Sequence, residues 1–265
     1  MNKSELVLSS ATTFFSGRIE SVFKKAKRYG FKYVEILPYR WTRPAQILSL
    51  EKKYGIEVAG IHLPTWWKKS CWRLLSKQPG IFSKLSSLII HFYLGCADQN
   101  PGWQIAEALG AKHPYVIFHT DVVADMGKIF NERADSIHAV IENIPYYQGN
   151  ADFYWNPAAT EKEMRNRGLN AGMAFDPGHF GETVNQMPNL NLLESYKQFR
   201  PEIIHISYNS HGLHLLPDEK EQEELQKMVQ IYPPKYIVIE TMPWVSAKKA
   251  KKMMEEIIEE GLKNN

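Results

Sequence analysis

The sequence predicts a single (β/α)8 barrel, an α/β fold with eight parallel strands, and two observations lead to it. Short apolar runs alternate with amphipathic segments along almost the whole chain of 265 residues. The runs are nearly continuous in hydrophobicity, as strands are when both faces of a parallel sheet are covered. Eight repeats of strand and helix within about 250 residues match this barrel. A doubly wound open sheet does not need eight strands.

The expected elements follow from these runs. Apolar residues at positions 19, 22, 23, 26 and 29 recur at helical spacing, and Gly30 stands where a helix would end. The segment AFDPGHFGE (174–182) is so rich in Gly and Pro that we expect no helix there. The expected strands cover residues 5–10, 32–37, 57–63, 115–120, 139–144, 171–176, 203–207 and 236–241, and further helices are expected at 161–168, 190–199, 219–229 and 246–261.

An insertion interrupts this rhythm after the third strand. Residues 64–100 are basic and rich in tryptophan, and contain the stretch WWKKSCWRLLSK, which begins at Trp66 and Trp67. We expect this segment to act as a lid that contacts the substrate, although an amphipathic helix that covers the barrel has the same composition. Because no low-complexity linker divides the chain, we expect residues 1–265 to form one domain.

Composition narrows the function classes. The net charge is +3, with 32 basic and 29 acidic residues, so neither a nucleic acid nor an anionic membrane is required as a partner. Two cysteines cannot form a disulfide framework, which favours a reducing compartment. The N-terminus lacks a signal-peptide pattern, and the longest apolar run, residues 85–97, is too short to span a bilayer. We therefore expect a soluble, cytoplasmic protein without a membrane partner.

Polar residues stand where the last six strands end. In a parallel barrel these ends meet at one mouth, so their side chains should converge. A single histidine at a strand end is usually a hydrogen-bonded rim residue, but three buried carboxylates at one mouth would repel each other without a cation. Imidazole and carboxylate ligands suit Zn²⁺, Mn²⁺ or Co²⁺. The residues are His62, His119, Glu142, Asp176, His205 and Glu240, with His179, His211 and His214 in the following loops.

Four short motifs at these strand ends resemble those of the xylose-isomerase-like barrel superfamily. They are VIENIP (140–145), FDPGH (175–179), IIHIS (203–207) and VIET (238–241), and they occur in the family's order. The resemblance covers essentially the whole chain, with residues 64–100 matching least well. It implies that one divalent ion is held by Glu142, Asp176, His205 and Glu240, and that His179 touches the substrate or a second metal ion.

The resemblance implies two competing activities. The first is a metal-dependent isomerase or epimerase of a sugar or sugar phosphate, in which Glu142 and Glu240 move a proton beside a carbonyl through an enediolate. The alternative is a zinc-dependent phosphoesterase or apurinic-site endonuclease with two or more metal ions. A lyase or dehydratase of the same fold, and a barrel that only binds a ligand, are further candidates. The near-neutral charge favours the sugar enzyme over one that binds DNA.

Departures from the family pattern affect this choice. His211 stands where the epimerases often carry an arginine. The endonucleases bind three metal ions, and the last of these uses an Asp-x-His in the loop after the seventh strand; here His214 remains but Gly212 replaces the aspartate, so the third site would be weakened or absent. His179 also matches one of the endonuclease histidines. His62 and His119 match the ligands of a second metal ion, which Glu142 would bridge. The sequence leaves the oligomeric state open, although barrels of this kind often form homodimers.

Glu35, at the end of the second strand, has two readings. It is placed to contact a substrate hydroxyl, or to form a rim salt bridge with Arg40 or Arg43.

Overall fold

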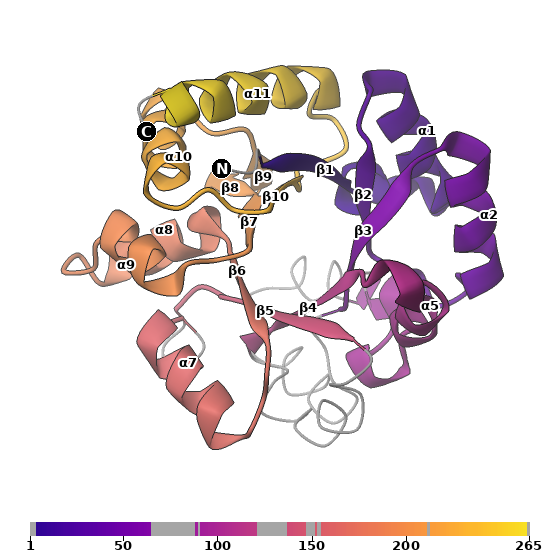
Figure 1. Cartoon of the computed structure of the whole chain (residues 1–265), viewed down its shortest axis with the longest axis horizontal. Coiled ribbons are helices and arrows are strands. Elements are labelled where there is room, and N and C mark those ends of the chain that lie inside the picture. The colour runs from indigo at the N-terminus through magenta and orange to yellow at the C-terminus, as the bar shows by residue number, and fades with distance from the viewer. Residues whose placement is uncertain are drawn as a thin grey trace.

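The computed structural model describes residues 4–64, 88–89, 91–120, 137–146, 152, 155–210 and 213–263. Its centre is a closed barrel with the strand order β1-β10-β7-β6-β5-β4-β3-β2, in which every neighbouring pair is parallel (Figure 1). The (β/α)8 prediction is therefore confirmed. The barrel strands are β1 (Glu5–Ser9), β2 (Tyr33–Ile36), β3 (Glu57–His62), β4 (Tyr115–His119), β5 (His138–Glu142), β6 (Gly172–Phe175), β7 (Ile203–Ile206) and β10 (Tyr236–Ile239).

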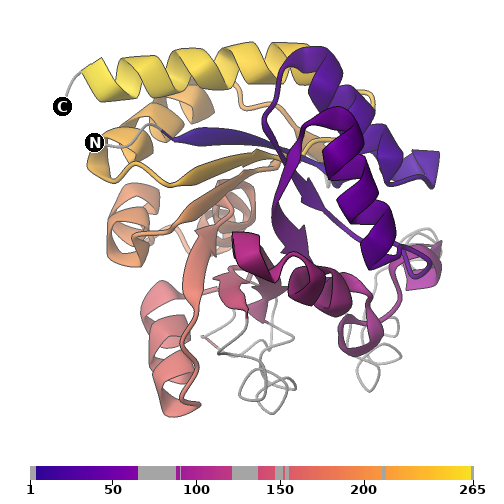
Figure 2. The same ribbon diagram turned by 45° about the vertical axis from the view of Figure 1, so that its right-hand side comes forward.

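Helices surround the barrel, and α11 runs along its outside beside β1 (Figure 2). The α-helices are α1 (Glu20–Tyr29), α2 (Pro44–Tyr54), α5 (Gly102–Ala108), α7 (Pro157–Asn166), α8 (Pro177–Gln186), α9 (Leu192–Phe199), α10 (Glu219–Ile231) and α11 (Ala247–Lys263). Shorter 3-10 turns are η1 (Ser10–Ser16), η2 (Ala97–Gln99) and η3 (Gly110–Lys112). In the described part of the chain, no helix is both long enough and apolar enough to cross a lipid bilayer.

Helix α8 contradicts the expectation that residues 174–182 are not helical. Pro177 is the first residue of the helix, where its missing N–H costs nothing. The side chain of Asp176 caps the helix by accepting a hydrogen bond from the backbone N–H of His179 at 2.9 Å. A Cβ atom on Gly178 would lie 2.5 Å from the carbonyl oxygen of Ser207, so glycine lets this helix approach β7 closely. The glycine and proline that argued against a helix are the residues that start it.

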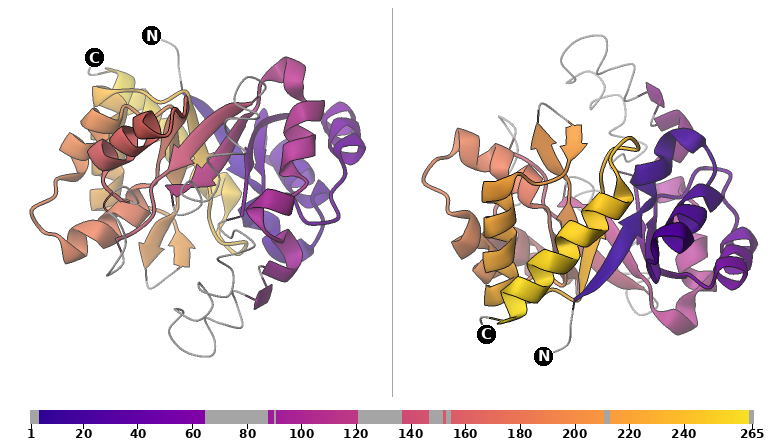
Figure 3. Two further views of the ribbon diagram at one scale, coloured as in Figure 1. Left: turned by 90° about the horizontal axis from the view of Figure 1, so that it is seen from below. Right: turned by 90° about the horizontal axis from the view of Figure 1, so that it is seen from above.

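A small antiparallel hairpin, β8 (Tyr208–Ser210) and β9 (Leu213–Leu215), follows β7 and was not expected from the sequence. Views from two sides place it at the end of the barrel opposite the two chain termini (Figure 3). This is the end where the barrel strands finish, so the hairpin stands beside the barrel mouth. The backbone N–H of Met242, just after β10, donates to the carbonyl oxygen of His214 at 2.8 Å and ties the hairpin to the barrel.

The inside of the barrel changes from apolar to polar along its axis. Towards the amino ends of the strands it is filled by a separate apolar cluster, which consists of Val7, Ala59, Tyr115, Ile117, Val140, Ala174, Ile203 and Val238. Towards the carboxyl ends stand buried glutamates and histidines. Because the apolar layer closes the barrel below them, these polar groups are open to solvent or ligand from the mouth alone.

Part of the predicted insertion is described, and it packs against the barrel. Ala97, within the insertion, is buried, and its carbonyl oxygen accepts a hydrogen bond at 2.7 Å from the indole of Trp103 on α5, which follows the insertion. The side-chain amide of Asn100 donates to the carbonyl oxygens of Pro38 and Leu94. Trp66 and Trp67 lie outside the described residues, so their role as a lid stays a prediction.

Helix α10 gives a prediction about stability. Asp218 and Glu221 form a capping box, with each side chain accepting from the other's backbone N–H at 2.9 and 2.8 Å. We expect Asp218→Ala to lower the free energy of unfolding by about 1 kcal/mol, because the backbone N–H of Glu221 loses its partner. Asp218→Asn should have almost no effect, since asparagine also caps helices. Urea unfolding of both variants measures the difference, and equal losses would contradict the capping role.

Candidate metal centre

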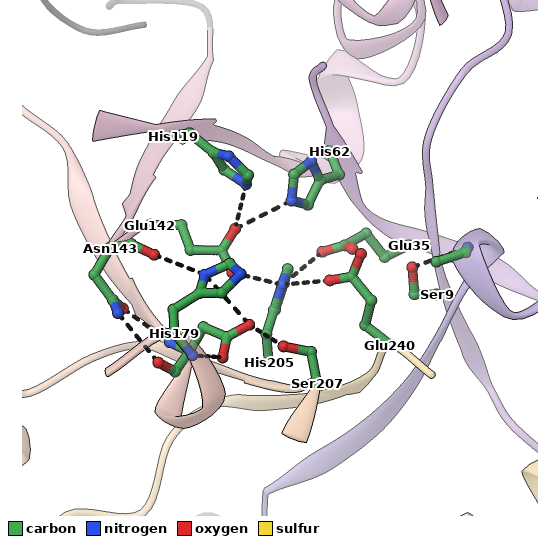
Figure 4. Close-up of polar contacts among 12 residues, drawn as sticks. Ser9, Glu35, His62, His119, Glu142, Asn143, His179, His205, Ser207 and Glu240 are labelled. Atoms are coloured by element: carbon green, nitrogen blue, oxygen red, sulfur yellow. Dashed lines mark hydrogen bonds and ion pairs between the residues drawn. The ribbon is translucent and has the colours of Figure 1, made fainter. Parts of the chain in front are cut away.

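Six polar side chains, five within strands and one directly after a strand, meet at the mouth of the barrel (Figure 4). His62, His119 and Glu142 are the last residues of β3, β4 and β5, and strand pairing places His119 directly opposite Glu142. The other three are Glu35 on β2, His205 on β7 and Glu240 just after β10. Short parallel strands therefore bring residues that are far apart in sequence to one level of the barrel.

Glu142 lies at the centre of this group and is almost fully buried. Its Oε2 lies 3.1 Å from Nε2 of His62 and 3.1 Å from Nε2 of His119. Its Oε1 lies 3.0 Å from Nδ1 of His205. One carboxylate thus faces three imidazoles, which is the arrangement expected of a group that bridges cations.

His205 shows an unusual lack of hydrogen bonding at one ring nitrogen. Its Nδ1 lies 3.0 Å from Oε1 of Glu142 and 3.0 Å from Oε2 of Glu240, yet it forms no hydrogen bond of acceptable geometry with either. The side chain has no solvent-exposed surface. A buried polar atom without a partner needs an explanation. Ligand atoms of His62, Glu142, His205 and Glu240 all lie within 4.8 Å of one another, so a single cation between them would satisfy this nitrogen.

The electrostatics of the site follow from burial and close pairing. Burial favours the neutral carboxyl of Glu240 and raises its pKa, but the close contact with the His205 imidazole and its charge outweigh burial and lower the pKa of Glu240 to about 2. Burial also raises the pKa of Glu142, but its three imidazole neighbours outweigh burial and hold the pKa well below the usual range. For His62, burial lowers the pKa, but Glu142 more than offsets this and raises it to about 9.

His119 differs from His62 although both contact the same oxygen. Burial dominates at His119 and lowers the pKa of its imidazole, and the neighbouring His62 and His179 add to the effect. Without a metal ion, the two imidazoles that contact Oε2 of Glu142 therefore differ in charge: His62 is protonated and His119 is neutral. The two rings meet edge to face with their centroids 5.0 Å apart.

Asp176 belongs to a second group, with Glu142 and His179, whose ligand atoms also lie within 4.8 Å of one another. Its Oδ1 caps α8, and its Oδ2 accepts a hydrogen bond from the hydroxyl of Ser207. Nδ1 of His179 lies 3.6 Å from that Oδ2 and 3.0 Å from the carbonyl oxygen of Asn143. The group of four thus contains His62, whereas the ligand atoms of Asp176 lie with those of Glu142 and His179, so the role of Asp176 as a metal ligand stays a prediction.

Three side chains with a role in this site were not singled out from the sequence. The side chain of Asn143 accepts from the backbone N–H of Asp176 at 2.9 Å and donates to its carbonyl oxygen at 3.1 Å, so it continues the β5–β6 pairing beyond the strands. The others are Ser207 and Tyr115. The position of Asn143 and Ser207 directly after strand ends is the signal that could have identified them.

The remaining predicted residues are placed as follows. Glu35 is fully buried and contacts His205 and Tyr115. His214 is half-buried on β9, with its ring centroid 6.4 Å from that of His179. His211 lies outside the described residues.

Comparison with known proteins supports the fold. No protein-family model matches the chain, and no curated protein matches its sequence. Among solved structures, AP endonuclease family 2 from Brucella melitensis is 12% identical with a TM-score of 0.63, covering 96% of this chain and 98% of that one. A xylose isomerase domain protein from Salmonella typhimurium is 14% identical with a TM-score of 0.54, covering 99% and 97%.

A third similar structure is the IolI protein with a bound zinc atom, which is 14% identical with a TM-score of 0.52 and covers 98% of this chain and 95% of that one. The chain has the fold of the xylose-isomerase-like barrels. At these identities the likeness concerns the fold. The case for a metal ion therefore depends on this chain's own histidines and glutamates.

Proposed function

We propose that this protein is a metal-dependent isomerase or epimerase that acts on a sugar or sugar phosphate. The observation that carries the proposal is the position of Nδ1 of His205, which lies 3.0 Å from two buried carboxylates without a hydrogen bond of acceptable geometry to either. Two imidazoles and two carboxylates form a donor set that suits Zn²⁺, Mn²⁺ or Co²⁺. The neighbours described as a xylose isomerase domain protein and a zinc-bound IolI protein support this reading.

The residues that would hold the ion are Glu142, His205 and Glu240, with His62 and Asp176, which both lie near Glu142, as the two candidates for a fourth ligand. A bound divalent ion supplies a Lewis acid that polarises the carbonyl and hydroxyl oxygens of a substrate. The protein surrounds that position with buried, preorganised groups. Asn143 and Ser207 hold Asp176 in place, and the edge-to-face contact of His62 and His119 restrains both rings.

Two carboxylates, those of Glu142 and Glu240, would carry out the proton transfer. Both Glu142 and Glu240 are ionised at neutral pH because neighbouring imidazoles lower their pKa values, and an ionised carboxylate is the form that accepts a proton. They come from β5 and β10, and each lies 3.0 Å from Nδ1 of His205. One carboxylate would remove the hydrogen beside the carbonyl, and the other would return a proton from the opposite face.

The experiment that tests this proposal is the exchange of substrate hydrogen with deuterated water, followed across a panel of ketoses and ketose phosphates. We expect metal-dependent incorporation of one deuterium beside the carbonyl of the true substrate. A protein that binds the metal ion but exchanges no hydrogen in any member of the panel would contradict the proposed reaction.

A zinc-dependent phosphoesterase or endonuclease is the second candidate, and His119 is the observation that favours it. His119 contacts Oε2 of Glu142 but lies outside the four-residue group, so Glu142 could bridge a second ion held by His62 and His119, in which case Asp176 and not His62 would complete the first site. The likeness to AP endonuclease family 2 agrees with this reading. The metal content per chain separates the two activities, since one ion favours the isomerase and two or more favour the hydrolase. Cleavage of an oligonucleotide with an abasic site tests the hydrolase directly.

Metal binding should release protons, which gives a prediction about pH. His62 has a pKa of about 9 in the metal-free protein and is therefore protonated at pH 7, as is His205, whose pKa its carboxylate neighbours raise well above the ordinary value. Ligand imidazoles must be neutral, so we expect about two protons to be released per ion at pH 7. Affinity should therefore rise as the pH increases from 7 towards 9.

Calorimetric titration with Zn²⁺ in two buffers of different ionisation enthalpy measures the protons released. Binding that releases no proton and shows no dependence on pH would mean that the ion lies away from His62 and His205.

A further inference from the structure

We propose that Glu35 is a positioning residue which, together with Tyr115, holds the imidazole of His205 with Nε2 protonated and so presents Nδ1 to the metal ion. The inference rests on the proposed function in that it concerns the same metal centre. It assigns a role to a buried carboxylate that is not among the four grouped ligands. Glu35 acts through His205 and not on the substrate.

The contacts of Glu35 support this role. Its Oε2 lies 3.1 Å from Nε2 of His205 and accepts a hydrogen bond from the hydroxyl of Tyr115 at 3.0 Å. Neither Glu35 nor His205 has any solvent-exposed surface. A carboxylate oxygen can only accept hydrogen bonds, so Nε2 of His205 must carry the hydrogen. Metal-binding histidines commonly donate their other ring N–H to a carboxylate in this way, which fixes both the tautomer and the ring orientation.

The barrel is built to allow this contact. Strand pairing places Glu35 opposite Gly60, and Gly60 opposite Tyr115, so three neighbouring strands supply the three residues at one level. A Cβ atom on Gly60 would lie 1.9 Å from a ring carbon of Tyr115. Because Gly60 has no side chain, the ring of Tyr115 can occupy this space, and its hydroxyl can reach Glu35.

The consequence appears on the other side of the His205 ring. Once the proton on Nδ1 has been released, the neutral ring keeps its hydrogen on Nε2 and turns a lone pair at Nδ1 towards Oε1 of Glu142 and Oε2 of Glu240, each at 3.0 Å. Three acceptor atoms facing one point repel each other unless a cation lies between them. Without Glu35, the neutral ring could place its hydrogen on Nδ1 and donate it to either glutamate. That tautomer cannot bind a metal ion at Nδ1.

The same observations argue against the two readings of Glu35 drawn from the sequence. Glu35 contacts Nε2 of His205, the ring nitrogen that does not face the carboxylates of Glu142 and Glu240, so it is poorly placed to bind a substrate hydroxyl. Its recorded partners are His205 and Tyr115, and neither Arg40 nor Arg43 appears among its ion pairs in the described residues.

Cobalt titration of the full chain tests the inference, because Co²⁺ reports both affinity and ligand geometry through its visible absorption. We expect Glu35→Gln to weaken Co²⁺ binding by about 10- to 100-fold, the usual effect of losing such a partner, and to change the absorption bands. Glutamine can offer its amide N–H₂ to Nε2, which favours the wrong tautomer. Tyr115→Phe should weaken binding less, since Glu35 keeps its contact with His205.

Glu51→Gln is the matched control. Glu51 is also a buried carboxylate, 7% exposed, and it accepts from the backbone N–H of Val58 at 2.8 Å and from Nζ of Lys112 at 2.9 Å. Val58 lies near the amino end of β3, away from the mouth. This variant should lose stability but bind Co²⁺ as the wild type does. Urea unfolding of all variants verifies that they are folded.

The outcomes separate the two proposals. If the wild-type chain binds no Co²⁺, the proposed function fails and this inference fails with it. If the wild type binds Co²⁺ and Glu35→Gln binds it as tightly as Glu51→Gln, with the same absorption bands, the positioning role of Glu35 is wrong while the metal centre stands.

Discussion

Replacement of Glu142 by glutamine should abolish most of the turnover, lowering it by about 10²- to 10⁴-fold, the range for loss of a general acid or base. The amide cannot accept the substrate proton. It also places an N–H₂ group against one of the imidazoles that Glu142 now contacts at 3.0–3.1 Å. We therefore expect weaker metal binding in addition to the loss of turnover. The fold should persist because glutamine has nearly the same volume.

Deuterium exchange and metal content measured on the same sample check this prediction. Glu57→Gln is a suitable control, since Glu57 is exposed and begins β3 at the opposite end of the barrel. The control should keep both properties. Turnover near the wild-type rate in Glu142→Gln would remove Glu142 from the proton transfer, and unchanged metal content would remove it from the ligands.

The strands were predictable because each barrel strand is covered on both faces. Such a strand must be apolar along its length, and β7, with the sequence IIHI, shows how clearly this pattern stands out even around a buried histidine. The convergence of strand ends followed from the barrel geometry alone. His62, Glu142, His205 and Glu240 were all named from the sequence for that reason, and the structure brings them within 4.8 Å of one another.

The helix at α8 and the role of Glu35 were not predictable in the same way. Pro and Gly weaken a helix only in its interior, and the sequence alone did not reveal that Pro177 is its first residue and Gly178 a point of close packing. The partner of Glu35 depends on how the barrel closes. Glu35 and His205 are 170 residues apart in the chain, and no local spacing relates them.

Substitution of Asp176 should separate its two possible tasks. As the N-cap of α8 it accepts from the backbone N–H of His179, a task that asparagine performs equally well. As a metal ligand it needs a carboxylate oxygen, and its Oδ2 is available for this role although it also accepts a hydrogen bond from the hydroxyl of Ser207. We expect Asp176→Ala to lower the free energy of unfolding by about 0.5–2 kcal/mol, and Asp176→Asn to change it little. Both variants should weaken metal binding by more than about 10-fold.

The comparison of the two variants decides between the tasks, because urea unfolding reports the cap and Zn²⁺ titration reports the ligand. If Asp176→Asn binds zinc as tightly as the wild type, Asp176 is only the cap of α8, and the ion is held by the group that contains His62 instead. If affinity falls in both variants while stability falls only in Asp176→Ala, the ion lies between Glu142 and Asp176, close enough to both for either carboxylate to be indispensable. Asp176 would then have two functions, since it would both cap the N-terminus of α8 and bind the metal ion.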